Sequence, residues 1–297
     1  MFSCSQDKQI KVWSLETNEC VQTLIGHRDT VNCIAMLPDG RLLSFSDDCN
    51  FKIWNLENGK CSKTMKAHSG GVLSLKKLSN SRLATGSVDE IKIWSLNDDM
   101  KCIQTIKTNS VSDDRNTLPF ISGFVELSNG NLVSSGYDKC IKVWDINKKK
   151  CLKTIVAHND RINGILLLKN GKIATCSNDK TIKVWKADQL KLVKTLNGHT
   201  SSVMCLDETS KEQIVSGSKC GTIKVWDLKN NNQNCIQTLI VKDYQGKREI
   251  ECIQYYQDDL VLCSGFNRYV QIWNIVTGVC VQTLAGHSNH ISHLLLA

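Results

Sequence analysis

The chain has 297 residues and a formal net charge of +8, and its basic residues are spread along the whole sequence. No apolar run approaches the roughly 18 residues of a membrane-spanning helix, and the first residues carry neither the basic nor the apolar region of a secretion signal. We therefore expect an intracellular protein, cytoplasmic or nuclear, without membrane insertion.

Seven tryptophans mark an internal repeat that runs through the chain. Each ends a short phrase of the kind Ile10-Lys11-Val12-Trp13, and successive tryptophans are 41, 40, 50, 41, 41 and 47 residues apart. A period of about 40 to 45 residues is typical of the four-stranded blades of a β-propeller. Since one blade cannot bury both of its faces, we expect a single domain over residues 1–297. Repeats 1 to 7 are those of Trp13, Trp54, Trp94, Trp144, Trp185, Trp226 and Trp273.

Four strands can be recognised in each repeat, and repeat 2 is the clearest example. Apolar runs alternate there with short turn sequences, two of which contain glycine. Glycine meets the backbone requirements of such tight turns. The expected strands, which we denote a to d, are residues 31–37, 41–46, 50–54 and 60–65.

The two ends of the sequence carry complementary parts of one repeat. Residues 1–5 match strand b of the other repeats, and residues 290–296 match strand a. We expect the last strand to complete the first blade, because such non-covalent closure removes two exposed sheet edges. The predicted fold is all-β, a closed ring of seven blades.

The fifteen cysteines could indicate disulfides or a metal site, but most of them follow the repeat. Six lie seven to nine residues after a tryptophan, where the remaining repeat has Leu192, and three share a position in strand a. No two lie within four residues of each other, unlike the paired ligands of zinc fingers. We expect buried, reduced thiols, no metal site and a reducing compartment. The first group is Cys20, Cys61, Cys102, Cys151, Cys235 and Cys280, and the second is Cys33, Cys205 and Cys252.

Together these features resemble the WD40 repeat family. The resemblance rests on the dipeptides Trp144-Asp145 and Trp226-Asp227, on a Gly-His pair before strand a in three repeats, and on an aspartate six residues before tryptophan in four. It covers the whole chain. It implies a seven-bladed propeller whose loops before strand a and between strands b and c open on one face, around a central channel.

The resemblance also implies a hydrogen-bond network that links a loop histidine, through serine or threonine, to an aspartate and the tryptophan. The same residue types form catalytic triads, but here the set occurs four times and has no strand-to-helix elbow to present a nucleophile. We expect structural bracing and no enzymatic activity. The four sets are His27, Ser44, Asp48 and Trp54; His68, Thr85, Asp89 and Trp94; His158, Thr175, Asp179 and Trp185; and His287, Ser3, Asp7 and Trp13.

Three repeats depart from this pattern. Repeats 4 and 7 lack the histidine and carry extra residues before strand a, at 110–117 and 242–248, while repeat 6 has Cys220 in place of the aspartate. We expect these blades to be the least stable part of the ring. Their insertions are either drift in a stable array or loops recruited for binding, and the sequence leaves both open.

Aromatic and basic side chains occupy loop positions that the resemblance places around the channel mouth. Phe120 and Tyr137 belong to repeat 4 and Arg161 to repeat 5, and such residue types are enriched at interaction hot spots. We hypothesise that these three anchor a partner site. The alternative is that Phe120 packs under the insertion of its own repeat. The hypothesis extends the site across the mouth with Lys219, Arg248 and Phe266.

These observations favour a monomeric, non-enzymatic scaffold or adaptor that binds a protein or peptide at the channel mouth, without a cofactor. One alternative is a recognition module of a larger protein, such as a ubiquitin-ligase receptor or an oligomerising sensor. Another is a nucleic-acid-associated propeller that uses the basic excess. The densest basic run, Lys148-Lys149-Lys150, has no interleaved aromatic residue, which argues against nucleic acid.

Overall fold

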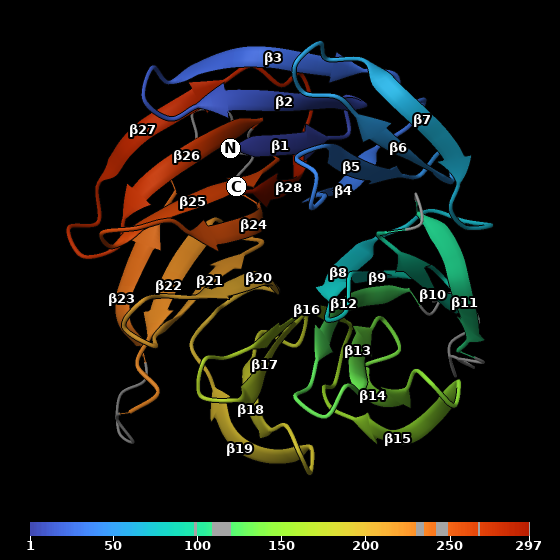
Figure 1. Ribbon diagram of the computed structural model, residues 1–297. Coiled ribbons are helices and arrows are strands. Elements are labelled where there is room, and N and C mark those ends of the chain that lie inside the picture. The colour runs from blue at the N-terminus through green and yellow to red at the C-terminus, as the bar shows by residue number, and fades with distance from the viewer. Residues whose placement is uncertain (98–99, 109–119, 230–234, 242–248, 267, 297) are drawn as a thin grey trace.

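The computed structural model describes all residues except 98–99, 109–119, 230–234, 242–248, 267 and 297. The described residues form seven antiparallel sheets of four strands each, arranged as blades around a central channel (Figure 1). The predicted all-β fold with seven blades is confirmed. The described residues include no helix long and apolar enough to cross a membrane.

Every blade runs from an inner strand a to an outer strand d. In blades 1 to 3 the strands are β28 (Ile291–Leu295), β1 (Phe2–Ser5), β2 (Gln9–Ser14) and β3 (Glu19–Ile25); β4 (Val31–Met36), β5 (Leu42–Ser46), β6 (Asn50–Trp54) and β7 (Cys61–Lys66); and β8 (Ser74–Leu78), β9 (Arg82–Gly86), β10 (Glu90–Ser95) and β11 (Lys101–Lys107). In blades 4 and 5 they are β12 (Ile121–Glu126), β13 (Leu132–Gly136), β14 (Cys140–Asp145) and β15 (Lys150–Val156); and β16 (Ile162–Leu167), β17 (Lys172–Ser177), β18 (Ile182–Lys186) and β19 (Lys191–Leu196). In blades 6 and 7 they are β20 (Val203–Glu208), β21 (Ile214–Ser218), β22 (Thr222–Trp226) and β23 (Cys235–Ile240); and β24 (Ile250–Tyr255), β25 (Leu260–Gly265), β26 (Tyr269–Asn274) and β27 (Cys280–Ala285).

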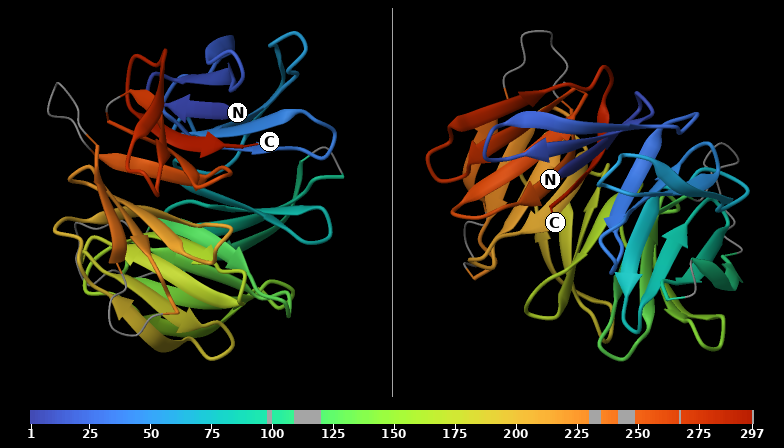
Figure 2. Two further views of the ribbon diagram at one scale, coloured as in Figure 1. Left: turned by 90° about the vertical axis from the view of Figure 1, so that its left-hand side faces the viewer. Right: turned by 45° about the horizontal axis from the view of Figure 1, so that its top comes forward.

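The ends of the chain meet inside blade 1. Strand β1 pairs with β2 on one side and with β28 on the other, and Ser3 lies opposite Leu294. Both views of Figure 2 place the two termini close together. The expected closure by the last strand is therefore confirmed, and it gives β1 a hydrogen-bonded neighbour on both sides.

The seven hydrophobic clusters lie between neighbouring blades, and each contains the tryptophan of one blade packed against the sheet before it. Trp94 of blade 3, for example, packs with Leu43, Phe51 and Ile53 of blade 2, and the ring centroids of Phe51 and Trp94 are 5.4 Å apart. Large aromatic rings supply much of the area buried in such contacts. The same arrangement recurs around the ring.

Blade 2 shows the predicted network in full. The indole N–H of Trp54 donates to the Ser44 hydroxyl at 2.8 Å, which lies 2.8 Å from Nε2 of His27. Nδ1 of His27 lies 2.8 Å from the Asp48 carboxylate, which also accepts the backbone N–H of Arg28. A neutral histidine satisfies the chain, because Nδ1–H donates to the carboxylate and Nε2 accepts from the hydroxyl. Accordingly, burial holds the pKa of His27 below its ordinary value.

The other three predicted networks are present, with one correction. His158 and His287 contact their hydroxyl and aspartate partners at 2.7 to 2.8 Å. In blade 3, however, His68 Nδ1 contacts Glu90 at 2.9 Å, and Asp89 instead lies 3.5 Å from Lys107. The prediction of Asp89 was wrong because blade 3 has one residue fewer between its network hydroxyl and its tryptophan, with nine positions from Thr85 to Trp94 against ten from Ser44 to Trp54. The longer glutamate side chain reaches the histidine from the first position of β10.

The irregular blades each lack part of the network. In blade 4, Lys142 forms an ion pair of 2.6 Å with Asp138, and the Trp144 N–H still donates to Ser134. In blade 7, Cys263 stands in place of the network hydroxyl, so the N–H of Trp273 faces only a thiol, which is a weak acceptor. The insertions at 110–117 and 242–248 lie outside the described residues.

The burial expected for the outer cysteines was wrong. Six strand-d cysteines lie directly opposite the tryptophans, but Cys61 and Cys102 are exposed and the other four are half-buried. Each thiol is close to the backbone oxygen two residues further along, as in the 3.2 Å contact from Cys61 to Lys63. Strand d is the outer edge of the blade, so its side chains lack a covering layer. All fifteen cysteines are free thiols.

Blade 6 offers a direct test of the network. Nδ1 of His199 has only the Thr222 hydroxyl at 3.2 Å, because Cys220 stands where the carboxylate lies in blade 2. We expect Cys220→Asp to raise the free energy of unfolding by about 1 kcal/mol, since it supplies a charged acceptor to the histidine and to a backbone N–H. Chemical denaturation measures the change. Cys220→Ser is the control and should give no such gain; a destabilised aspartate variant would contradict the assignment.

The buried histidines also predict the pH dependence of stability. Burial lowers the pKa of both His68 and His199 to about 4, below the ordinary value of 6.5. The unfolded chain therefore binds more protons between these values, and stability falls as the pH falls through this range. We expect a loss of the order of 1 to 2 kcal/mol for each histidine between pH 7 and pH 5. Denaturation at several pH values checks this, and His199→Gln should flatten the dependence; an unchanged slope would refute it.

Candidate functional site

The inner strands of all seven blades enclose a central cavity of about 600 Å³. Six of these strands carry a register shift near their start, where two residues lie opposite one. The extra residue of such a β-bulge is unpaired and can be turned away from the sheet. The residues at this position line the cavity, and they are Asn32, Ser122, Asn163, Met204, Glu251 and Ser292.

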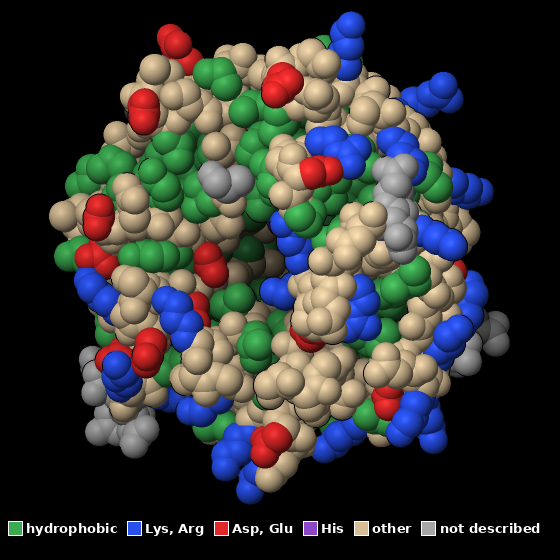
Figure 3. All heavy atoms as spheres, in the orientation of Figure 1, with side chains coloured by type: hydrophobic (Ala, Val, Ile, Leu, Met, Phe, Trp, Pro, Cys, Tyr) green, Lys and Arg blue, Asp and Glu red, His purple; other side chains and the backbone are tan. Residues whose placement is uncertain are grey.

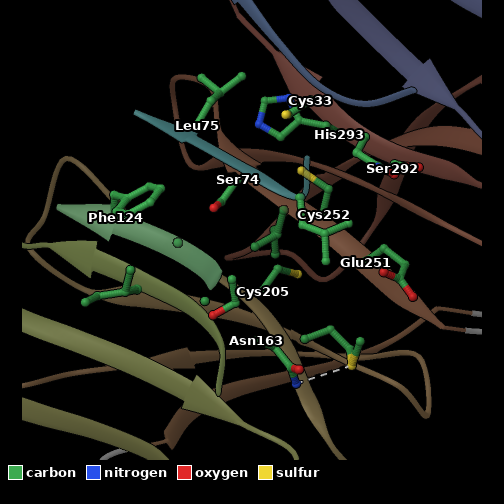
Figure 4. A pocket seen from close by; sticks show the side chains of 18 of the residues that line it. Cys33, Ser74, Leu75, Phe124, Asn163, Cys205, Glu251, Cys252, Ser292 and His293 are labelled. Atoms are coloured by element: carbon green, nitrogen blue, oxygen red, sulfur yellow. Dashed lines mark hydrogen bonds between the residues drawn. The ribbon is translucent and has the colours of Figure 1, made fainter. Parts of the chain in front are cut away.

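The cavity wall combines polar groups with thiols and apolar side chains. Figure 4 shows Cys33, Cys205, Cys252 and His293 around it, on four different strands. Burial raises the pKa of all three thiols, that of Cys252 to about 12, so they stay protonated and are poor nucleophiles. No cluster of three or more His, Cys, Asp or Glu side chains suited to a metal ion occurs in the described part of the chain.

Two asparagines at the channel bulges brace neighbouring blades. The Asn32 amide donates to the Asp47 carboxylate at 2.7 Å and to the Val72 carbonyl of the next blade at 3.1 Å. The Asn163 amide makes the equivalent contact with the Val203 carbonyl at 2.8 Å. These bonds fix the loops at the mouth of the channel. The mouth is therefore held in position before any partner arrives.

Three of the residues predicted for the site lie together at this mouth. The Arg161 guanidinium stands 5.1 Å from the centroid of the Tyr137 ring, and the rings of Phe120 and Tyr137 meet edge to face at 5.8 Å. Tyr137 also lines the cavity. Phe120 and Tyr137 are half-buried and Arg161 is exposed. The resulting cluster joins loops of blades 4 and 5, and we call it the aromatic anchor.

The other predicted residues contact partners elsewhere around the mouth. Phe266 stacks on His290 with the ring centroids 4.5 Å apart, and Lys219 lies 3.5 Å from Glu249. Neither pair contains a residue of the aromatic anchor. Arg248 lies outside the described residues, as does the insertion under which Phe120 was alternatively expected to pack.

Sequence reasoning missed a carboxylate that lines the cavity together with Tyr137. Glu251 is a bulge residue of blade 7 that lines the cavity, and burial raises its pKa. Burial also raises the pKa of Tyr137, and the charge of Glu251 raises it further, so the two groups interact across the mouth. In a regular strand successive side chains point to opposite faces, and this rule applied to β24 gives no sign of the bulge. Comparison of the equivalent position in all seven repeats would have identified it.

Comparisons with known proteins agree with this architecture. The family model of the WD domain, G-beta repeat, matches residues 18–55, 59–95, 100–145, 149–186 and 190–227. An uncharacterised WD repeat-containing protein of Schizosaccharomyces pombe is 49% identical over 47 residues, which are 16% of this chain and 13% of that protein. A Lissencephaly-1 homolog of Caenorhabditis briggsae is 51% identical over 43 residues, 14% of this chain and 11% of that protein. The CCR4-associated factor 4 homolog of Candida glabrata is 26% identical over 155 residues, 50% of this chain and 19% of that protein.

The chain spans less than a fifth of the length of these relatives. Each matched segment combines strand d of one blade with strands a to c of the next, so the sequence repeat is offset from the blade by one strand. The matched segments cover about two thirds of the sequence, and the seven blades extend the pattern over the rest. The chain belongs to the WD40 repeat family.

Proposed function

We propose that this propeller is a non-enzymatic scaffold that binds a protein or peptide partner at the channel mouth. The observation that carries the proposal is the aromatic anchor, in which Arg161 stacks over Tyr137 beside the open cavity. WD40 propellers generally mediate protein–protein interactions, which fits this assignment. The anchor gives the partner a defined place to bind.

The aromatic anchor has the chemistry of an interaction hot spot. Tyrosine and arginine are enriched at such positions because they offer large contact areas and several hydrogen-bond donors. The stacking on Tyr137 orders the Arg161 side chain in advance, which reduces the entropy lost on binding. Glu251, across the mouth, adds a carboxylate that can accept a donor from the partner. A segment that runs from blades 4 and 5 across the mouth toward blade 7 would reach all of these groups.

Two features support a role without catalysis. The histidine network occurs in four complete copies that each brace a blade, which is not the pattern of a unique nucleophile and base. The channel thiols have raised pKa values, as described above. Free cysteines throughout the chain favour a reducing compartment, and the proposal places the scaffold inside the cell.

A role as the recognition module of a larger protein is the second candidate. One relative is named an F-box/WD repeat-containing protein, from Dictyostelium discoideum, and the chain matches only 3% of its length. Propellers thus occur there with additional sequence. The aromatic anchor would serve the same purpose in that setting, so both candidates share one binding surface.

Replacing Tyr137 and Arg161 with alanine tests the proposed surface. We expect partners recovered with the wild-type protein to be lost, because both the stacked cation and its ring are removed. Affinity purification followed by binding measurements with the purified partner gives the result. The matched control is Tyr255→Ala with Lys211→Ala, which also removes one tyrosine and one cation, but at the opposite end of the blades, where they contact Ser210 and Asp259. Equal partner recovery by both folded variants would contradict the proposal.

A further inference from the structure

Basic residues occur in every repeat, but their excess over acidic residues is concentrated in blade 5. Residues 157–197, which form blade 5, contain eight lysines and arginines against three acidic residues, and so carry more than half of the net charge of +8. In Figure 3, most Lys and Arg side chains lie along the right-hand and lower rim, which blades 2 to 5 form in Figure 1. The upper left of that view, over blades 7 and 1, shows hydrophobic patches and several acidic side chains but few Lys or Arg side chains.

Three lysines of blade 5 lie side by side on adjacent strands. Lys172 of β17 is the direct cross-strand partner of Lys186 in β18, and Lys186 is the partner of Lys191 in β19. Like charges placed directly opposite each other destabilise a sheet. We call this set the lysine row.

The equivalent position is polar or acidic in every other blade. Lys186 directly follows Trp185, and the residues that follow the other tryptophans are Ser14, Asn55, Ser95, Asp145, Asp227 and Asn274. In blade 4, Asp145 pairs across the strands with Lys150 and lies 3.6 Å from Lys148, which balances the basic run there. The ammonium groups of the lysine row have no acidic partner at salt-bridge distance among the described residues. The row therefore carries uncompensated charge.

The lysine row borders a groove between blades 4 and 5, at the opposite end of the blades from the aromatic anchor. The groove has a volume of about 400 Å³ and is bounded by the β12–β13, β16–β17 and β18–β19 turns. Leu127, Leu167 and Ala187 supply an apolar floor, and Lys172 and Lys186 line its edge. An apolar floor beside two cations is suited to an aliphatic side chain flanked by carboxylates.

We propose that this groove binds an extended acidic peptide segment that places an aliphatic residue on the floor and carboxylates against the lysine row. Charge complementarity selects this occupant, since the row lacks an internal counter-charge. Nucleic acid fits less well, because no aromatic side chain or arginine lines the groove, and stacking on such groups supports single-strand binding. This surface is separate from the proposed partner site at the channel mouth.

A fluorescein-labelled peptide of alternating glutamate and leucine is the probe, and fluorescence anisotropy measures its affinity. We expect saturable binding that weakens as salt is added. Lys186→Asp should reduce the affinity by roughly tenfold or more, because it reverses the central charge of the row. The same variant should raise the melting temperature, since a lysine–aspartate–lysine row replaces three like charges. If Lys186 had only a structural role, Lys186→Asp would not lower the affinity for the peptide while it raises the melting temperature.

The matched control is Lys180→Asp, which makes the same charge change in blade 5 but at the other end of β17 and β18. It should leave the affinity unchanged, and so should the Tyr137→Ala and Arg161→Ala double variant. Three results would overturn the proposal: the peptide fails to bind the wild-type chain, Lys186→Asp binds it equally well, or single-stranded polyuridine binds more tightly and displaces it. The last result would identify a nucleic-acid surface.

Discussion

The position of each tryptophan determines how the whole ring is assembled. In six blades the indole N–H is bound to a hydroxyl of its own blade, as in the 2.8 Å bond from Trp54 to Ser44, while in all seven the ring packs against the sheet of the preceding blade. One side chain thereby fixes both the local turn geometry and the contact between neighbours. Because the hydroxyl also contacts the loop histidine, the loops at the channel mouth are tied to the same point. The aromatic anchor depends on this framework for its placement.

The repeated pattern made most of the fold predictable. The tryptophan spacings gave the number of blades, the turn glycines gave the strand bounds of blade 2, and the matching ends gave the closure. The errors came where one residue changes the geometry. Blade 3 has one residue fewer between its network hydroxyl and its tryptophan, so Glu90 contacts His68 in place of Asp89. The exposure of Cys61 was missed because a position that varies between cysteine and leucine looks internal, although strand d has no neighbour on its outer side.

The candidate site was only partly predictable, because it depends on contacts between repeats. Residue type and loop position were enough to predict that Tyr137 and Arg161, of adjoining blades, lie together. They were not enough to place Phe266, because its stacking partner His290 immediately precedes the closing strand. Glu251 was missed because a β-bulge inserts one residue and reverses the expected direction of its side chain. Long-range pairings of this kind leave no local signal in a single repeat.

The two proposed binding surfaces lie in blades that differ in their histidine networks. The aromatic anchor uses loops of blade 4, which lacks the loop histidine and has an ion pair between Lys142 and Asp138 instead. The lysine row instead lies in blade 5, whose network of His158, Thr175 and Asp179 is complete. A fully braced blade can tolerate like charges across its strands, since its tryptophan and loop remain fixed. The two surfaces therefore occupy opposite ends of neighbouring blades, and each could change in sequence without disturbing the contacts that hold the other in place.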